Sequence, residues 1–409
     1  MIEERSLRVL MVAPTSFFND YGGHIRILEE TLALQEQGVQ VTIVTYRQGQ
    51  DIDGLDIRRT ARLPYHADYE VGSSRHKLAF DVYLLGQTLL EGMRARPDII
   101  HGHMHEGALI GSALAKMLRR PLVFDFQGGL TGEMVDHGFL NPDGRIFPWV
   151  WWLERFICHL PNVVLTSSLR AKQLLQREFG VAEERVVPLP DCVDTGRFNR
   201  ERVSQAAQRQ LKQSLGIPDE RPVVAYLGLL ADYQGTDHLV QAAALLKRRG
   251  RSVHFLIMGY PRVAYYQAMA RRLDVADRIT FTGKVPYERA PLYLSLGDVA
   301  VSVKMSETEG SGKVLNYMAL AQPVVAYDTR VHREYLAEWG TYVPVADVPG
   351  LATSIAELID DPERRQDLGV ALRHRAKNHY SWTRAGDRIQ TVYKALLGGG
   401  DFSGLLSNY

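Results

Sequence analysis

Cysteine and long apolar runs are both scarce in this chain of 409 residues. Only two cysteines occur, Cys158 and Cys192. They are far apart and lack metal-ligand spacing, which is typical of a protein from a reducing compartment. No apolar run reaches the roughly 18 residues that a membrane span needs. The N-terminal segment carries acidic residues where a secretory signal would be basic. We therefore expect a cytoplasmic protein without a signal peptide.

An excess of either charge is also missing. The chain has 48 Lys plus Arg against 47 Asp plus Glu. This balance argues against a nucleic-acid partner, because such proteins present basic surfaces. Internal repeats and low-complexity tracts are absent too. The length exceeds what one core usually supports, so we expect two domains of about 150 to 200 residues each.

Short apolar segments alternate with helical ones through both halves of the chain. In the first half, strands are expected at 8–13, 39–45, 98–101, 121–126, 162–166 and 185–189. Helices are expected between them at 25–37, 77–94, 107–118, 147–159 and 169–179. The second half has expected strands at 223–227, 253–258, 278–281, 298–303, 323–327 and 341–344, and a last helix at 383–397. Near-continuous apolar strands alternating with helices predict parallel sheets covered on both faces.

The predicted fold is therefore α/β, with two doubly wound, Rossmann-like domains facing across a cleft. We place the first at 1–195 and the second at 196–380. The segment 381–409 is expected to be a helix and tail that crosses back to the first domain. In open parallel sheets, ligands bind outside the carboxyl ends of the strands, so the loops there hold the candidate residues.

No G-x-G-x-x-G fingerprint follows any of these strands, which argues against a dinucleotide-dependent oxidoreductase. The first strand instead leads to Gly22-Gly23 at the start of a helix. Two glycines allow a phosphate to approach a helix N-terminus, and they equally suit a tight turn.

Three histidines, His101, His103 and His105, follow the strand at 98–101. Zinc binding is one interpretation, but no second His or Cys cluster lies nearby to complete a tetrahedral set. A hydrogen-bonding or proton-handling imidazole in the cleft fits better, with a capped polar loop as the alternative. After the next strand, Asp125 and Gln127 either meet sugar hydroxyls or are simply solvated.

The segment from residue 306 to 317 carries the most specific signal. Glu309 stands at the mouth of a helix, Gly310-Ser311-Gly312 leads into it, and Lys313 lies in its first turn. Backbone amides at a helix N-terminus carry partial positive charge and can hold phosphate or sugar oxygens. An ordinary strand, turn and capped helix is the competing interpretation.

Residues 147–160, FPWVWWLERFICHL, contain three of the five tryptophans. Interfacial membrane helices use aromatic anchors of this kind. The polar face lacks a Lys/Arg stripe, so we favour an amphipathic helix that packs Trp151, Phe156 and Leu160 into a core. Peripheral membrane contact stays open as the alternative.

Taken together, these segments resemble the retaining glycosyltransferases of the GT-B fold, specifically the GT4 group, over nearly the whole chain. The turn Gly22-Gly23 corresponds to the glycines that contact the donor diphosphate in the family. His103, counted from Asp98, corresponds to the histidine that reaches the transferred sugar, with His105 as the runner-up.

The segment that begins at Glu309 is similar to the family's E-x7-E element followed by P-V-V-A. Glu309 stands at the first glutamate, which contacts donor-sugar hydroxyls in the family. The second glutamate, which holds the ribose in the family, is replaced by Tyr317. A phenol can still hydrogen-bond a hydroxyl, although it lacks the strong carboxylate acceptor.

A second departure concerns the diphosphate. The family usually carries an Arg and a Lys after the first strand of the second domain, and Leu229 and Gln234 occupy those positions. Loss of these charges should slow departure of the leaving group. Lys313 is our candidate replacement, and Lys304 is a weaker one.

The resemblance implies a metal-independent enzyme, without a cofactor, that transfers a sugar from a nucleoside-diphosphate donor to a hydroxyl acceptor with retained configuration. The implied catalytic residues are Glu309, His103 and Lys313. The implied donor-binding residues are Gly22, Gly23, Gly310, Ser311, Gly312, Val314, Tyr317, Gly283 and Lys284. The implied acceptor-side residues are His105, Gln127 and Asp125.

Two alternatives remain open at this point. One is another GT-B enzyme, such as a nucleotide-sugar epimerase or a phosphorylase. The other is a sugar-nucleotide-binding protein that has lost transfer, as the residues at 229, 234 and 317 suggest. The sequence does not indicate the base, the sugar, the acceptor or the oligomeric state.

Overall fold

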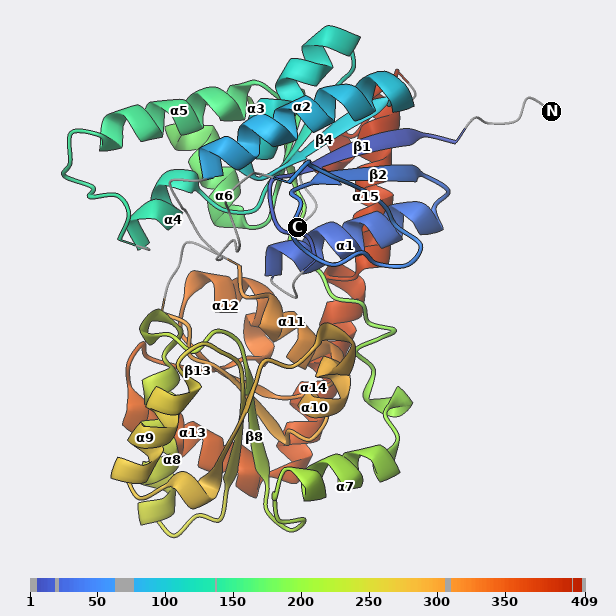
Figure 1. Ribbon diagram of the computed structural model, residues 1–409. Helices are drawn as coiled ribbons and strands as arrows, with labels where there is room; N and C mark the ends of the chain where they lie inside the picture. The colour runs from blue at the N-terminus through green and yellow to red at the C-terminus, as the bar shows by residue number, and fades with distance from the viewer. Residues whose placement is uncertain are drawn as a thin grey trace. The chain divides into compact units, whose positions relative to one another are not determined.

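The computed structural model describes residues 6–18, 22–62, 77–136, 138–305, 310–398 and 400–406. The chain divides into two compact units (Figure 1). The first unit comprises Met1–Asp191 together with Trp382–Tyr409, and the second comprises Cys192–Ser381. The last helix therefore belongs to the first unit, although the whole second unit precedes it in sequence.

The first unit is built on a seven-stranded sheet in the order β3-β2-β1-β4-β5-β6-β7. Its strands all pair in parallel: β1 Arg8–Ala13, β2 Gln40–Thr45, β3 Asp56–Arg59, β4 Ile99–His103, β5 Leu122–Phe126, β6 Val163–Thr166 and β7 Val186–Pro188. Its helices are α1 Gly22–Glu36, α2 Lys77–Ala95, α3 Met104–Leu118, α4 Leu130–Asp136, α5 Phe147–His159, α6 Leu169–Gln173 and α15 Trp382–Leu396.

Helices cover both faces of this sheet, as the alternation along each strand requires. On β1, Leu10 and Val12 join the core that packs under α2 and α3. Met11 points the other way, and its sulfur accepts a hydrogen bond from Thr31 of α1. Successive side chains of a strand point to opposite faces, so one apolar strand supplies both cores. Helix α15 packs alongside α1.

The second unit repeats this architecture with a six-stranded parallel sheet in the order β10-β9-β8-β11-β12-β13. Its strands are β8 Val223–Leu227, β9 His254–Met258, β10 Ile279–Gly283, β11 Val299–Ser302, β12 Val324–Tyr327 and β13 Thr341–Val343. Its helices are α7 Gln205–Ser214, α8 Thr236–Arg248, α9 Val263–Arg272, α10 Ala290–Leu294, α11 Gly312–Ala319, α12 Arg330–Leu336, α13 Val348–Asp360 and α14 Pro362–His379.

The predicted fold class is confirmed, because both units are doubly wound parallel sheets with helices. Each predicted strand agrees with the structure within two residues at each end. The edge strand β3 escaped prediction because its sequence, DIRR, has a single apolar residue. Helix α4 was also missed, and α3 begins at Met104 instead of 107, which brings His105 and Glu106 into its first turn.

The predicted packing of α5 is wrong in part. Trp151 does pack inward, with its ring 5.5 Å from that of Phe179. Phe156, however, is 43% exposed, and the residues that α5 buries are Glu154, Ile157 and Cys158. The helix buries a carboxylate and presents aromatic rings outward. No helix among the described residues is long and apolar enough to cross a membrane.

Candidate active site

In the first unit, the predicted residues gather at the carboxyl ends of three adjacent strands. His103 is the last residue of β4, and Asp125 lies beside it in the register of β5. Gly22 and Gly23 begin α1, the helix that follows β1. Because parallel strands end at the same edge of a sheet, β1, β4 and β5 bring these residues together.

Asp125 is the centre of this group. Its carboxylate, which is 0% exposed, accepts hydrogen bonds from Arg26 Nε at 2.9 Å and Nη2 at 2.7 Å. It also contacts His103 Nδ1 at 3.1 Å and accepts from Gln127 Nε2 at 2.8 Å. Burial alone would raise the pKa of Asp125, but Arg26 and His103 outweigh it and hold the pKa well below its ordinary value.

Two predicted acceptor-side contacts change in consequence. Asp125 was expected to meet sugar hydroxyls, yet both of its oxygens are buried and engaged, so it positions His103 instead. Gln127 is half-buried, and its amide nitrogen is held by Asp125. A Cβ placed on Gly23 would lie only 3.0 Å from Oε1 of Gln127. A residue larger than glycine at 23 would therefore press on Gln127.

His103 keeps one nitrogen without a hydrogen bond. An ionised Asp125 can only accept, so Nδ1 of His103 donates to it and Nε2 is the ring nitrogen that remains for a ligand. Nε2 is buried and has no hydrogen-bond partner among the described residues. Leaving such a group unpaired costs about 1–3 kcal/mol, which a ligand hydroxyl could recover. This geometry fits the predicted contact between His103 and a sugar.

The other two histidines are structural. The ring of His101 stacks on that of His103 at 4.6 Å, and its Nδ1 is 2.6 Å from the hydroxyl of Tyr393 in α15. Burial, together with the neighbouring His103, lowers the pKa of His101 well below its ordinary value. His105 was the runner-up to His103, but its Nε2 lies 3.4 Å from Glu154 Oε1 and its ring packs edge-on against Phe124.

The contacts of Glu154 determine which side of α5 faces the protein interior. Its carboxylate accepts the backbone N–H groups of Leu130 and Thr131, each at 2.9 Å, and so caps the first turn of α4. Burial opposes ionisation, but His105 and Thr131 hold the pKa of Glu154 below its ordinary value. His105 therefore lies in the packing between α3 and α5, and its predicted contact with an acceptor is not supported.

Glu30, His101 and His103 have donor atoms within 4.8 Å of one another, which is the arrangement of a possible cation site. The charges argue against it. Arg26 Nε lies 3.0 Å from Glu30 Oε1, so a guanidinium already occupies the mouth of the cluster. Burial and the charge of Asp125 raise the pKa of Glu30 well above its ordinary value, which favours a neutral carboxyl. We assign no metal to this cluster.

Because the pKa of Glu30 is raised, the stability of the wild type and that of Glu30→Gln should depend differently on pH. Below the unfolded pKa of the carboxyl, it is neutral in both states, so its ionisation costs nothing. As the pH rises above that value, the unfolded state loses the proton first, and the wild type loses stability until the folded pKa is reached. Glu30→Gln has no proton to lose and should avoid this decline. Urea unfolding at about pH 5 and about pH 8 tests this, since stability that falls equally in both proteins would contradict a neutral Glu30.

In the second unit, Lys313 lies at the loop that follows β8. Its Nζ donates to Gln234 Oε1 at 2.7 Å and is 4.5 Å from the centre of the Tyr226 ring. A Cβ placed on Gly228 would be 2.9 Å from the same Nζ. The ammonium therefore sits beside the position where the GT4 resemblance expects a lysine and this chain has Gln234. Glu309 and the rest of 306–309 lie outside the described residues.

Lys304 and Ser311 shape the start of α11. Lys304 is 3% exposed, and its Nζ donates to the carbonyl of Gly310 at 2.9 Å. Ser311 precedes Gly312, the first residue of the helix, and its buried hydroxyl is 3.4 Å from that of Ser302. The space where Gly312 would carry a side chain is open. Lys304 thus anchors this loop, while Lys313 is the cation carried by the helix.

Val314 and Tyr317 face inward from α11, and both are 0% exposed. The hydroxyl of Tyr317 accepts the N–H of Leu227 at 2.8 Å, at the end of β8. The predicted contact of Tyr317 with a ribose is therefore not supported, because the phenol oxygen is enclosed by the strand end it stabilises. Tyr317 holds the loop against which Lys313 rests.

Gly283 and Lys284, predicted beside the nucleotide base, lie at the carboxyl end of β10. Gly283 has a φ of 71°, a conformation that favours glycine. Its carbonyl accepts the N–H of Gly259 at 2.9 Å. Lys284 is exposed, with Nζ 6.0 Å from the centre of the Tyr260 ring. Their loop shares the sheet edge with the loop after β8.

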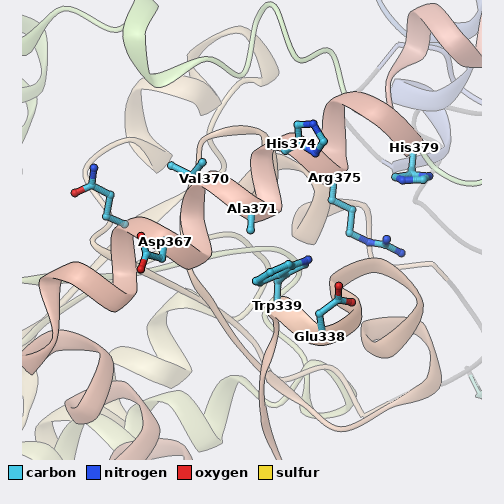
Figure 2. A pocket seen from close by; sticks show the side chains of 9 residues that line it. Glu338, Trp339, Asp367, Val370, Ala371, His374, Arg375 and His379 are labelled. Atoms are coloured by element: carbon cyan, nitrogen blue, oxygen red, sulfur yellow. The ribbon is translucent and has the colours of Figure 1, made fainter.

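A hollow of about 700 Å³ lies elsewhere in this unit, between α14 and the turn that carries Trp339 (Figure 2). That turn precedes β13, so the hollow lies at the amino end of the strand. Arg375, one of its lining residues, donates to the carbonyls of Glu334 and Tyr335 at the end of α12. None of the predicted site residues lines this hollow.

Arg26 and Glu30 were not among the predicted site residues. Both lie on α1 within two turns of Gly23, on the face turned toward β4 and β5. A sequence signal did exist, since Arg26 and Glu30 are opposite charges four residues apart in a helix and lie among the apolar residues Ile27, Leu28 and Leu34. Their partner Asp125 is 99 residues from Arg26, so only the fold reveals the cluster.

Comparison with known families matches most of the chain. The model for glycosyl transferases group 1 matches residues 207–375, and the model for glycosyltransferase family 4 matches residues 22–197. The chain is 29% identical to alpha-D-kanosaminyltransferase of Streptomyces kanamyceticus over 252 residues, which are 61% of this chain and 64% of that protein. It is 30% identical to D-inositol 3-phosphate glycosyltransferase of Corynebacterium diphtheriae over 399 residues, 91% of this chain and 90% of that protein.

Solved structures with the same fold cover nearly the whole chain. Sucrose-phosphate synthase of Thermosynechococcus elongatus superposes with a TM-score of 0.80 at 18% identity, covering 96% of this chain and 100% of that one. Anabaena HepE in complex with UDP gives a TM-score of 0.76 at 14% identity, covering 95% and 100%.

Proposed function

Because the chain belongs to the group 1 glycosyltransferases of the GT-B fold, GT4-like in kind, we propose that it transfers a sugar from a nucleoside diphosphate to a hydroxyl acceptor. The observation that carries the proposal is the placement of Lys313. Its ammonium is held at the N-terminus of α11, against the loop after β8, where the resemblance expects the diphosphate. HepE, which has this fold, binds UDP and UDP-glucose, and this supports a nucleotide-sugar donor.

The leaving diphosphate develops negative charge as the glycosidic bond breaks. A positive side chain and helix amides fixed at that position stabilise this charge without the cost of reorganising solvent. We propose that Lys313 and the amides of Gly310, Ser311 and Gly312 supply this stabilisation. The resemblance separately implies a donor contact for Gly22 and Gly23. This arrangement would make a bound metal ion unnecessary.

The sugar itself would be oriented by Glu309 and His103. His103 Nε2 is the buried nitrogen described above, and the contact with Asp125 fixes the orientation of the ring. A single oriented ring nitrogen suits a sugar hydroxyl near the reacting carbon, because a hydroxyl can both donate and accept. We propose retention of configuration through attack on the same face as the leaving diphosphate, which relies on positioning more than on the carboxylate pair of ordinary glycosidases.

Nucleotide binding provides the first test. We expect UDP, GDP or ADP, each added with its sugar conjugates, to raise the melting temperature selectively for one base. A ligand at about a hundred times its Kd adds about 2.7 kcal/mol of stability, which is readily measured. If no nucleoside diphosphate or nucleotide sugar raised the melting temperature at millimolar concentration, the proposed donor class would be wrong.

A binding protein without transferase chemistry is the second candidate, favoured by the enclosed Tyr317 and by Leu229 and Gln234 at the usual cationic positions. Radiolabelled nucleotide sugars separate the two functions. Release of the nucleoside diphosphate, accelerated by an acceptor, supports transfer. Saturable binding without release, across donors and hydroxyl acceptors, supports the binding protein.

A further inference from the structure

The outward side of α5 is strongly apolar for a protein surface. Six exposed side chains on α5 and the segment before it form what we call the aromatic face: Phe139, Ile146, Trp149, Trp152, Leu153 and Phe156. Trp149 is 74% exposed and Trp152 is 56% exposed. The rings of Trp152 and Phe156 stack at 5.6 Å. Contiguous exposure of this kind marks an interaction site on a folded domain.

The orientation of α5 is fixed from inside the protein. Glu154 is held inward by the amides of α4 and by His105, so a rotation of the helix that buried its tryptophans would break these contacts. Losing the partners of a buried carboxylate is strongly destabilising. The buried contacts of Glu154 therefore keep the aromatic face exposed to solvent.

Neighbouring helices extend the apolar surface. Helix α3 packs between α2 and α5 (Figure 1). Both α2 and α3 expose further large apolar side chains: Val82, Tyr83, Leu90, Met93, Leu109 and Met117. These twelve exposed side chains in all lie on three adjacent helices and the segment before α5.

The charges exposed on these helices have one sign. Arg94 on α2, Lys116 on α3 and Arg155 on α5 are exposed, and Arg119 and Arg120 follow at the end of α3. The acidic residues of the three helices are Asp81, Glu91, Glu106 and Glu154, and none of the four is exposed. The loop before α5 adds one exposed charge of each sign, Asp143 and Arg145. Helix α5 has no stripe of Lys and Arg residues, and the neighbouring helices α2 and α3 supply further exposed basic residues.

We infer that the aromatic face and the basic end of α3 dock on the surface of an anionic phospholipid bilayer. Tryptophan places an apolar ring among acyl chains and a polar N–H among headgroups. Each Lys or Arg near an anionic surface strengthens binding about fivefold. Helix α5 has 13 residues, about 20 Å of helix, which suits a helix lying in the interface.

A second copy of the chain fits this surface less well. Two copies meeting through it about a two-fold axis would bring Lys116, Arg119 and Arg120 of each copy near those of the other, with no exposed acid on the three helices to pair with them. The docking is independent of the proposed donor site, which lies in other loops, and the two ideas can fail separately.

Vesicle sedimentation with the full-length chain tests the inference. We expect binding to vesicles of phosphatidylcholine with about 30% phosphatidylglycerol to exceed binding to pure phosphatidylcholine at least about tenfold, and to weaken with salt. Trp149→Ser with Trp152→Ser should lower the binding at least about tenfold. Lys116→Glu with Arg119→Glu and Arg120→Glu should remove the preference for the anionic lipid. Trp339→Ser, a half-exposed tryptophan of the second unit, is the matched control.

All substituted positions are exposed, so the variants should keep the melting temperature and donor binding of the wild type. Failure of the wild type to bind anionic vesicles would overturn the inference, as would equal binding by the double tryptophan variant. A dimer that dissociates in that variant, without vesicle binding by the wild type, would assign the face to a second copy instead.

Discussion

Replacing Lys313 by methionine should lower kcat by about a hundredfold or more while the protein stays folded. Removing one fixed donor from a developing oxyanion typically costs a factor of about 10² to 10³ in rate. Methionine keeps most of the length and apolar stem of lysine, so packing against Tyr226 persists while the ammonium beside Gln234 is lost. Turnover with saturating donor, together with the donor Kd, provides the measurement.

Two further variants sharpen this experiment. Lys313→Arg keeps the positive charge and should recover part of the lost rate. Lys394→Met removes an exposed lysine of α15 and should leave both parameters unchanged. Wild-type kcat together with wild-type donor affinity in Lys313→Met would refute the assignment of Lys313 to the diphosphate.

Substituting Asp125 by asparagine should destabilise the first unit by up to about 3–5 kcal/mol. Removing one partner of a buried ion pair costs this much when the other charge is left uncompensated, and Arg26 keeps part of its compensation. Arg26 would keep Glu30 and Asp191 as partners but lose the bidentate contact with Asp125. Chemical denaturation of both proteins at neutral pH measures the difference.

The matched comparison is Asp328→Asn, which removes the carboxylate paired with Arg333. That pair has a similar geometry, at 2.7 Å, but its side chains are 43% and 53% exposed. An exposed pair contributes at most about 1 kcal/mol. If the two substitutions destabilised the protein equally, burial would not be what makes the Asp125 cluster strong. Asp125→Asn should also reduce turnover, because asparagine lacks the charge that binds Arg26 and holds the ring of His103 less firmly.

The fold was readable from the sequence because it depends on local pattern. Apolar strands such as VLMVA and VVAYL, each followed by a helix, specify parallel sheets whatever the ligand. Strand β3 was not predicted, because an edge strand is only partly packed and needs few apolar residues. The start of α3 was misplaced for a different reason: neither His103 nor its neighbours provide a side-chain cap.

The sequence predicts site residues only from their position. His103 and Lys313 stand at strand and helix ends, where position alone suggests ligand contact, and that contact stays a prediction. Asp125 and Tyr317 stand at equally suggestive positions, yet the structure turns them inward. Nothing local distinguishes a polar side chain that meets a ligand from one that holds its neighbour, because the partners Arg26 and Leu227 are 99 and 90 residues distant.

The discontinuous first unit has a consequence for synthesis on the ribosome. Residues from Trp382 onward emerge after all of the second unit. Until then, α1 lacks its neighbour α15, and His101 lacks the hydroxyl of Tyr393. The histidine pair at the end of β4 is therefore completed only after the whole second unit has been synthesised. An interrupted chain would carry a well-formed second unit beside an unfinished first one.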